Sequence, residues 1–247
     1  MRARFVKLPP VRVLSIVHER TAASGVFGEV LRERGEEVLE WLPPLGGPSP
    51  VPEPDAVLVF GGAMNCEQEP QHGWLAPEKQ YLRGLLAAGT PALGVCLGAQ
   101  LLAEAAGGRV RRMPAPEIGW KSVRVEPGAG GDPVLAVLPE RFEGFQWHSF
   151  AVSPSPGWAV LARSDACVEA FRTAAAPWWG IQFHAEVTGE SIEGWIDDYR
   201  SDPDAVAAGI DWDGLRTASA RQIERWNSLG RTLCARFLDH AATLGRR

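Results

Sequence analysis

The sequence predicts an α/β fold in which a mostly parallel sheet is covered by helices on both faces. Near-continuous apolar runs of strand length alternate with helical patterns in the N-terminal half, and such strands are typical of parallel sheets buried on both sides. Glycines and polar residues follow several of these runs, as expected where parallel strands end at one sheet edge. A chain of 247 residues is long enough for one large core with an added element.

The elements of the N-terminal half follow from short patterns. Apolar runs predict strands at 11–17, 37–42, 55–60 and 91–95. Two helices between these strands are predicted from apolar residues at helical spacing, namely Val26, Phe27, Val30 and Leu31 in the first and Leu75, Leu82, Leu85 and Leu86 in the second. The Pro- and Gly-rich stretch 43–54 indicates a surface connection.

The C-terminal half has two different patterns. Short strands and turns are expected from 109 to 182, with strands at 122–126, 158–162 and 168–172, and these suggest a small antiparallel extension. Residues 190–247 are predicted to be helical. An apolar stripe there recurs every three or four residues, which favours packing on the core over a cap on the active site or an oligomer contact; its members are Ile223, Trp226, Leu229, Leu233 and Phe237.

Composition narrows the functional classes. The formal net charge of −5 and a pI near 5.6 give no electrostatic footprint for nucleic acid. No apolar run approaches the roughly 18–20 residues that span a bilayer. The basic segment 1–10 lacks an apolar stretch, so we do not interpret it as a signal peptide. A cytoplasmic, reducing location is therefore expected, with neither a membrane nor a nucleic acid as partner.

The most informative segment is a strand-to-helix turn that carries a cysteine. The apolar run 91–95 ends in Gly94-Val-Cys96-Leu-Gly98, and 101–106 has the composition of a helix. The two glycines allow the backbone to pass close to itself, as in a nucleophile elbow. The start of the helix offers free N–H groups and a positive dipole end, which favour a thiolate and can hold an oxyanion. Cys96 is therefore predicted to be a nucleophile.

A base for this nucleophile lies in a second apolar run, 178–183, which ends in His184-Ala-Glu186. Residues two apart in an extended segment point to the same side, so the carboxylate of Glu186 is expected to fix and stabilise the imidazole of His184. The order Cys, His, Glu differs from that of α/β-hydrolases, where the acid precedes the His.

The elbow and the His-x-Glu pair together resemble the class I glutamine amidotransferases, the triad family that removes ammonia from the side chain of glutamine. Three further segments are similar to motifs of this family: the Gly-Gly loop 60–65, the Glu-Ile-Gly-Trp segment 117–120 and the segment 145–150. The last two resemble a subgroup that is similar to the amidotransferase domain of GMP synthetase. The resemblance covers about 10–187 and rests on four ordered motifs, so its signal is specific.

The resemblance implies a flavodoxin-like, three-layer amidotransferase domain at 10–189, with 190–247 packed on it as a helical extension. It implies that Cys96, His184 and Glu186 are catalytic. The N–H groups of Leu97 and Gly62 are expected to form the oxyanion hole, with Gly62 favoured over its neighbour. Residues expected to contact the substrate are Gly61, Gln100, His148, Ser149 and Phe150.

Other titratable residues have simpler interpretations. Cys66, Cys167 and Cys234 are expected to be inert core thiols, and their wide spacing shows no metal-ligand pattern. We therefore expect neither a metal ion nor a cofactor. His148 competes with His184 as base but has no carboxylate two residues on. His18, His72 and His240 are expected in loops or on the surface, and Glu117 is interpreted as structural.

The sequence leaves the fate of the ammonia open. The chain contains no Gly-x-x-x-x-Gly-Lys-Ser/Thr loop for ATP, so an amidotransferase role requires a separate synthetase as partner. A stand-alone γ-glutamyl hydrolase acting on small conjugates is the second hypothesis. A non-catalytic regulatory module is the third, and the intact triad argues against it. Trp147 and Ser149 depart from the family pattern beside the pocket, which leaves the identity of the substrate open.

Overall fold

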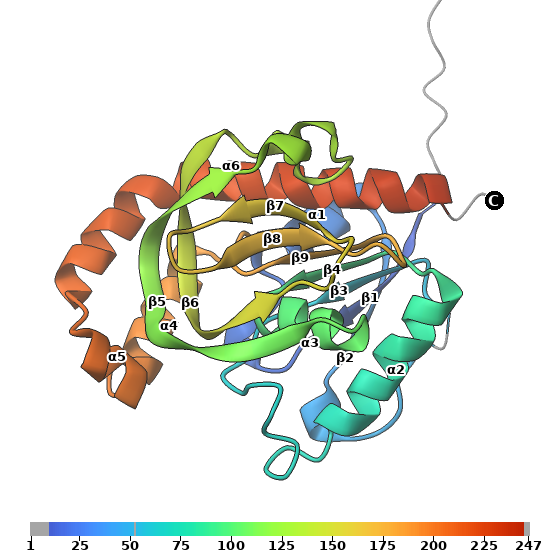
Figure 1. Cartoon of the computed structure of the whole chain (residues 1–247), viewed down its shortest axis with the longest axis horizontal. Helices are drawn as coiled ribbons and strands as arrows, with labels where there is room; N and C mark the ends of the chain where they lie inside the picture. Colours follow the sequence, from blue (N-terminus) through green and yellow to red (C-terminus); the bar gives the residue numbers. More distant parts are fainter. Residues whose placement is uncertain (1–9, 52, 245–247) are drawn as a thin grey trace, which may run out of the picture.

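The computed structural model describes residues 10–51 and 53–244. Most of the basic N-terminal segment discussed above thus lies outside the described residues. Within them, nine strands form one sheet in the order β2-β1-β3-β4-β9-β8-β6-β5-β7 (Figure 1). The strands are β1 (Arg12–Ile16), β2 (Glu37–Trp41), β3 (Ala56–Val59), β4 (Ala92–Val95), β5 (Arg109–Val125), β6 (Arg141–Ser153), β7 (Ala159–Arg163), β8 (Val168–Arg172) and β9 (Trp178–Ile181).

Five of these strands form the parallel part of the sheet. Every pairing along β2-β1-β3-β4-β9 is parallel. The four strands predicted in the N-terminal half correspond to β1 to β4, each within two residues at either end. Three of the five, β3, β4 and β9, are buried at every position, which explains their near-continuous apolar sequences.

The antiparallel part is larger than the sequence predicts. Strand β6 pairs with β5 and β8, and β7 pairs with both β5 and β8, so these four strands close on themselves like a small barrel. The short strand expected at 122–126 is the end of the 17-residue β5. A register shift lies between Arg112 and Glu117, where β5 carries two prolines, and it interrupts the alternation from which a long strand could be recognised. The prediction of a mostly parallel sheet with a small extension is wrong in this proportion.

Helices cover both faces of the sheet. Strand β1 shows why, because Val13 faces one hydrophobic cluster whereas Leu14 and Ile16 face the other. The first cluster includes buried side chains of α1 (Gly25–Arg34), α4 (Gly189–Tyr199) and α6 (Trp212–Leu244). The second includes α2 (Leu75–Ala88) and α3 (Leu97–Ala105). The alternation of side chains along the strands thus builds a three-layer arrangement.

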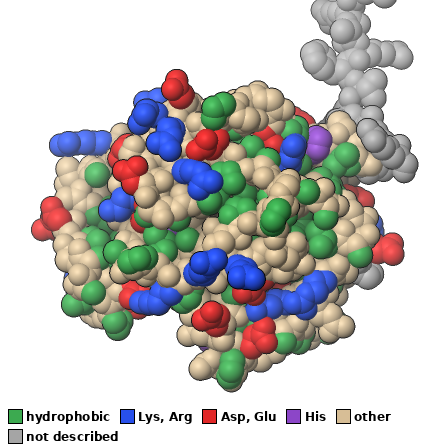
Figure 2. Space-filling view, in the orientation of Figure 1, with side chains coloured by type: hydrophobic (Ala, Val, Ile, Leu, Met, Phe, Trp, Pro, Cys, Tyr) green, Lys and Arg blue, Asp and Glu red, His purple; other side chains and the backbone are tan. Residues whose placement is uncertain are grey.

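The C-terminal residues form α4, α5 (Pro203–Ala208) and the 33-residue helix α6. Helix α6 runs along one side of the sheet (Figure 1) and buries Trp226, Leu233 and Phe237 in the same cluster as α1. No helix among the described residues is long and apolar enough to cross a membrane. On the face shown in Figure 2, basic and acidic side chains are interspersed.

Candidate active site

The turn between β4 and α3 holds Cys96 in a strained conformation. Its φ of 52° is positive, and among the described residues no other non-glycine residue has a positive φ. Such backbone strain is kept where the surroundings enforce it, often at active sites. Both flanking glycines are required, since a Cβ on Gly98 would lie 2.0 Å from the carbonyl oxygen of Val59 and one on Gly94 would lie 2.6 Å from the backbone of α3. The elbow therefore depends on these three residues together.

His184 lies close to this elbow and is held by its own backbone. Strand β9 ends at Ile181, so His184 and Glu186 follow the strand and do not belong to it, contrary to the sequence interpretation. The His184 N–H donates to Phe145 O at 2.8 Å, and the indole N–H of Trp226 donates to His184 O at 2.8 Å. Both flanking layers thus fix the segment that carries the imidazole.

The side chains of His184 and Glu186 form a buried ion pair. Nδ1 of His184 lies 2.7 Å from Oε1 of Glu186, and both side chains are almost completely buried. Burial by itself lowers the pKa of His184, but the charges of Glu186 and Cys96 outweigh burial and raise this pKa to about 10. The imidazole is therefore held in its protonated form next to the Cys96 sulfur. The indole of Trp195 packs edge-on against it, with ring centroids 4.7 Å apart.

The Gly-Gly loop after β3 closes another side of the site. Gly61 faces the imidazole, since a Cβ there would lie 3.0 Å from Cε1 of His184, and Gly62 lines the cavity described below. His18 anchors this loop, because its Nδ1–H donates to the carbonyl oxygens of Phe60 at 3.0 Å and Gly61 at 3.2 Å. The expectation that Gly61 contacts substrate is thus replaced by a packing contact with the imidazole.

His18 is not on the surface, contrary to the sequence-based expectation. Its side chain is completely buried, and its Nε2 lies 3.0 Å from Oε1 of Glu78, which is also buried. Burial lowers the pKa of His18, but Glu78 and the two loop carbonyls raise it above its usual value on balance. No sequence pattern indicates this pair, because Glu78 lies on α2, far from His18 along the chain.

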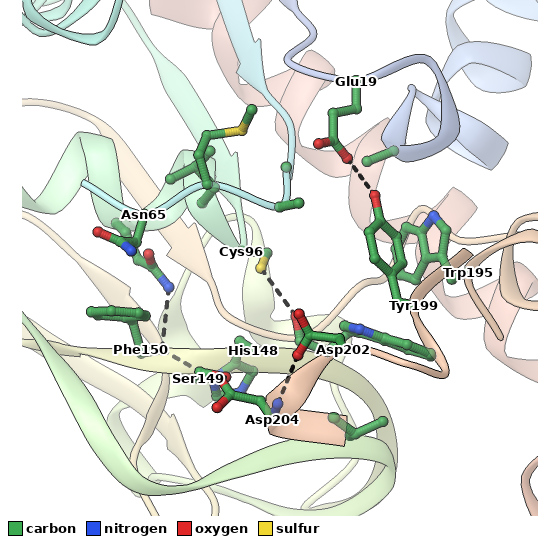
Figure 3. Close-up of a pocket in the computed structure, with 18 of the residues that line it drawn as sticks. Glu19, Asn65, Cys96, His148, Ser149, Phe150, Trp195, Tyr199, Asp202 and Asp204 are labelled. Atoms are coloured by element: carbon green, nitrogen blue, oxygen red, sulfur yellow. Dashed lines mark hydrogen bonds between the residues drawn. The ribbon is translucent and has the colours of Figure 1, made fainter. Parts of the chain in front are cut away.

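A cavity of about 280 Å³ opens in front of Cys96. This is the small end of the range for ligand pockets and suits a substrate of amino-acid size. In Figure 3, Cys96 lies between Asn65 on one side and Trp195 and Tyr199 on the other. The sequence-predicted residues that line this cavity are Gly62, Cys96, Leu97, Gln100, His148, Ser149, Phe150 and His184.

The predicted substrate residues are connected to one another. Nε2 of Gln100 donates to Phe150 O at 3.2 Å, and the guanidinium of Arg112 stacks 5.6 Å above the Phe150 ring. The Ser149 hydroxyl donates to Asp204 (Figure 3). The carbonyl of Trp147 lies 3.7 Å from the Cys96 sulfur. One segment of β6 thus forms a continuous wall beside the nucleophile.

His148 is unsuited to be the base. Its Nδ1–H donates to Phe150 O at 3.0 Å, and its Nε2 lies 3.6 Å from Oε2 of Glu117. Both ring nitrogens therefore face protein groups. Burial lowers the pKa of His148 to about 3, so its imidazole is neutral at physiological pH. His184 is consequently the histidine placed and charged for proton transfer.

Several residues of the pocket are not predictable from the sequence. Glu19 follows β1 and accepts a hydrogen bond of 2.9 Å from the hydroxyl of Tyr199 (Figure 3). Trp195 and Tyr199 belong to α4, and Asp202 and Asp204 lie at the start of α5. No sequence pattern marks them, because the folded chain brings them together from positions far apart. The C-terminal residues thus supply part of the cavity wall in addition to core packing.

Comparisons with known proteins agree with this geometry. The family model "Glutamine amidotransferase class-I" matches residues 43–194. The glutamine-hydrolysing subunit of the GMP synthase of Sulfolobus acidocaldarius is 34% identical over 143 residues, which are 56% of this chain and 72% of that protein. The glutamine amidotransferase-like protein YfeJ of Salmonella typhimurium is 27% identical over 192 residues, covering 75% of this chain and 80% of that protein.

Among solved structures, a glutamine amidotransferase from Thermotoga maritima superimposes with a TM-score of 0.83 at 27% identity. The match covers 94% of this chain and 99% of that chain. The region matched by the family model contains the elbow, the Gly-Gly loop and the His-x-Glu segment. The chain therefore belongs to the class I glutamine amidotransferase family.

Proposed function

We propose that this protein hydrolyses the γ-amide of glutamine, or the γ-glutamyl bond of a close analogue, through a thioester on Cys96. The observation that carries the proposal is the arrangement of three groups: a cysteine on a strained elbow, a protonated His184 beside it, and Glu186 at 2.7 Å from the imidazole. Structural cysteines need no such partners, whereas nucleophilic cysteines do.

The chemistry follows from this arrangement. The Cys96 thiolate attacks the γ-carbonyl carbon, and the negative charge moves to the carbonyl oxygen. The N–H groups of Leu97 and Gly62 would hold this oxyanion, each donor being worth about 3–4 kcal/mol in the transition state. His184 gives its proton to the leaving nitrogen as the C–N bond breaks. Water, deprotonated by His184, then cleaves the thioester and releases glutamate.

The substrate would be held by the wall beside the nucleophile. Gln100, Ser149 and Phe150 lie together there, and the acidic side chains of Glu19, Asp202 and Asp204 line the same cavity with one basic residue, Arg112. An excess of carboxylates favours a cationic group. The α-amino group of a glutamyl substrate carries such a charge.

The same acidic wall supports a second candidate function. Trp195, Tyr199, Asp202 and Asp204 lie beyond residue 194, where the match to the family model ends. This part of the wall therefore follows no family pattern, and it supports a stand-alone hydrolase whose γ-glutamyl substrate carries a larger or cationic amine. The first candidate instead passes ammonia to a separate synthetase partner, as the name of the Sulfolobus GMP synthase relative suggests.

One experiment tests both candidates. The purified chain is offered glutamine, glutathione and γ-glutamyl amides of neutral and cationic amines, and released glutamate and amine are quantified. Cys96→Ala is the inactive control, and Cys234→Ala, which alters a buried thiol far from the site, is the matched control. Slow release from glutamine alone supports a partner-dependent amidotransferase, and fast release from a conjugate supports the hydrolase. Activity that survives in Cys96→Ala contradicts the proposal.

A further inference from the structure

A second cluster of chemically competent side chains lies at the back of the pocket wall. Glu117 on β5, His148 on β6, Cys167 just before β8 and Glu169 on β8 place one ligand atom each within 4.8 Å of all the others. The fold explains this convergence. Glu117 pairs directly with His148 in the β5–β6 ladder, and residues two apart in an extended segment, as Cys167 and Glu169 are, point to the same side.

The distances between these atoms match a tetrahedral metal site. The Cys167 sulfur lies 3.4 Å from Oε2 of Glu117 and 3.4 Å from Oε1 of Glu169. Nε2 of His148 lies 3.6 Å from Oε2 of Glu117. Four ligands at zinc-ligand bond lengths of about 2.0–2.3 Å are about 3.3–3.7 Å apart in a tetrahedron. These three separations therefore already have the spacing of a coordination shell.

The orientation of His148 is the second, independent observation. Its Nδ1–H donates to the Phe150 carbonyl, so in the neutral ring Nε2 carries a lone pair. This Nε2 is buried, has no hydrogen-bond partner, and points toward the carboxylate and the thiol. A lone pair directed at oxygen and sulfur atoms is unfavourable without a cation between them. A backbone carbonyl that fixes the other ring nitrogen is also the usual support of a metal-binding histidine.

The two carboxylates point to the same conclusion. Both are buried, and none of the ion pairs formed by the described residues joins Glu117 or Glu169 to a lysine or arginine. Buried carboxylates normally have a cationic partner or bind a metal. Each also has an outer support, because Gln146 donates to Oε2 of Glu169 at 2.8 Å and leaves Oε1 to the cluster, while Ser164 donates to Glu117 at 3.1 Å.

We propose that Glu117, His148, Cys167 and Glu169 form a structural site for one divalent cation of the zinc type. A set of one thiolate, one imidazole and carboxylates suits Zn²⁺ better than Mg²⁺ or Ca²⁺, which prefer oxygen ligands alone. With all four ligands from the protein, the site is closed and not catalytic. This goes beyond the proposed hydrolase and does not depend on it.

A bound cation would have a consequence for the pocket. His148 stands between Trp147, whose carbonyl contacts the Cys96 sulfur, and Ser149, which holds Asp204. A cation bound to His148 therefore ties the β6 wall of the active site to β5 and β8. Its ligands act as positioning residues for that wall, and they touch no reacting atom.

The test measures metal binding directly. Purified protein is stripped with a chelator, dialysed against Zn²⁺ or Co²⁺, and analysed for bound metal. We expect one ion per chain, and a Co²⁺ complex whose absorption spectrum contains a thiolate-to-cobalt band. Cys167→Ser should abolish this band, and Glu169→Gln, which preserves size and removes the charge, should weaken binding by more than about tenfold. Cys234→Ala and Cys96→Ala, which change thiols outside the cluster, should bind normally.

Three results would overturn the proposal. The first is less than a tenth of an ion per chain, which would mean that the two carboxyl groups share a proton instead. The second is a Co²⁺ spectrum that Cys167→Ser leaves unchanged. The third is binding that disappears in Cys96→Ala, which would place the metal at the nucleophile. If Cys167→Ser does not fold, Glu169→Gln alone decides the outcome, because it preserves the shape of the side chain.

Discussion

Replacing Glu186 by glutamine tests the proposed triad most directly. The substitution keeps the size of the side chain and removes the negative charge that faces His184 at 2.7 Å. In the wild type the pKa of His184 is raised from 6.5 to about 10, against burial, with Glu186 as the largest raising influence and Cys96 as the second. The difference between these values corresponds to about 5 kcal/mol that favours the imidazolium.

The size of the effect follows from this figure. If Glu186 supplies about half of the stabilisation, its loss costs about 2.5 kcal/mol, or about 70-fold in rate. Loss of the fixed imidazole tautomer adds to this, and removal of the corresponding charge in a serine protease triad costs about 10⁴-fold. We therefore expect kcat to fall by about 10²–10⁴-fold with little change in KM.

The assay is release of glutamate at saturating substrate, measured across pH. Because the variant lowers the pKa of His184, the alkaline limb of the rate profile should move to lower pH. Glu190→Gln, which makes the same change at an exposed position of α4, is the matched control. A variant kcat within threefold of the wild type, in a protein that melts normally, would refute the assigned role of Glu186.

The same pair predicts how stability depends on pH. A pKa raised by folding means that the folded state binds the proton more tightly than the unfolded state. The contribution of His184 to the free energy of unfolding is thus complete below pH 6.5 and is lost as the pH rises to about 10. Glu186→Gln should flatten this dependence in urea unfolding curves recorded between these pH values.

The remaining predictions concern the supports of the site. Gly98→Ala should destabilise the protein by about 3 kcal/mol or more, because a Cβ would lie 2.0 Å from a backbone oxygen; Gly84→Ala, on open helix surface, should instead add about 0.5–1 kcal/mol, and chemical unfolding distinguishes the two. Glu78→Gln should cost about 3–5 kcal/mol, since it leaves His18 buried without its charged partner; an unchanged melting temperature would contradict this. Tyr199→Phe should raise KM several-fold at constant kcat, and a fall in kcat alone would speak against a binding role.

The parallel part of the fold was predictable because its signals are local. Strands β3 and β4 are buried on both faces, so every residue in them is apolar or glycine, and their boundaries are visible in the sequence. The elbow was equally visible. Gly94 and Gly98 flank Cys96 because the backbone leaves no room for a side chain at either position. Patterns that arise within a few residues can be recognised without the structure.

Features that depend on the folded chain were not predictable. Strand β5 carries two prolines at an irregularity in its pairing with β6, and a pattern of alternation cannot continue through such a point. The acidic wall joins Glu19 to Asp202 and Asp204 across most of the chain length. His18 was predicted on the surface because its partner Glu78 lies on another element.

The cluster behind the pocket escaped for the same reason. Cysteine spacing suggests a metal site only when the ligands occur in pairs along the sequence, as in zinc fingers. Here the ligands come from three neighbouring strands, and only Cys167 and Glu169 are close in sequence. The expectation of no metal site rested on spacing alone, and spacing does not report on the pairing of β5 with β6.

The contact between α6 and the His-x-Glu segment limits where this protein can be divided. Trp226 and Asn227 bond to the backbone oxygens of His184 and Val187, and Gly230 packs directly on the carbonyl of Ala185. A version cut after residue 189 would retain every proposed catalytic residue and yet lose the brace that sets the imidazole. The boundary drawn from sequence is therefore no boundary of function: the last helix is as much a part of the reaction centre as the elbow itself.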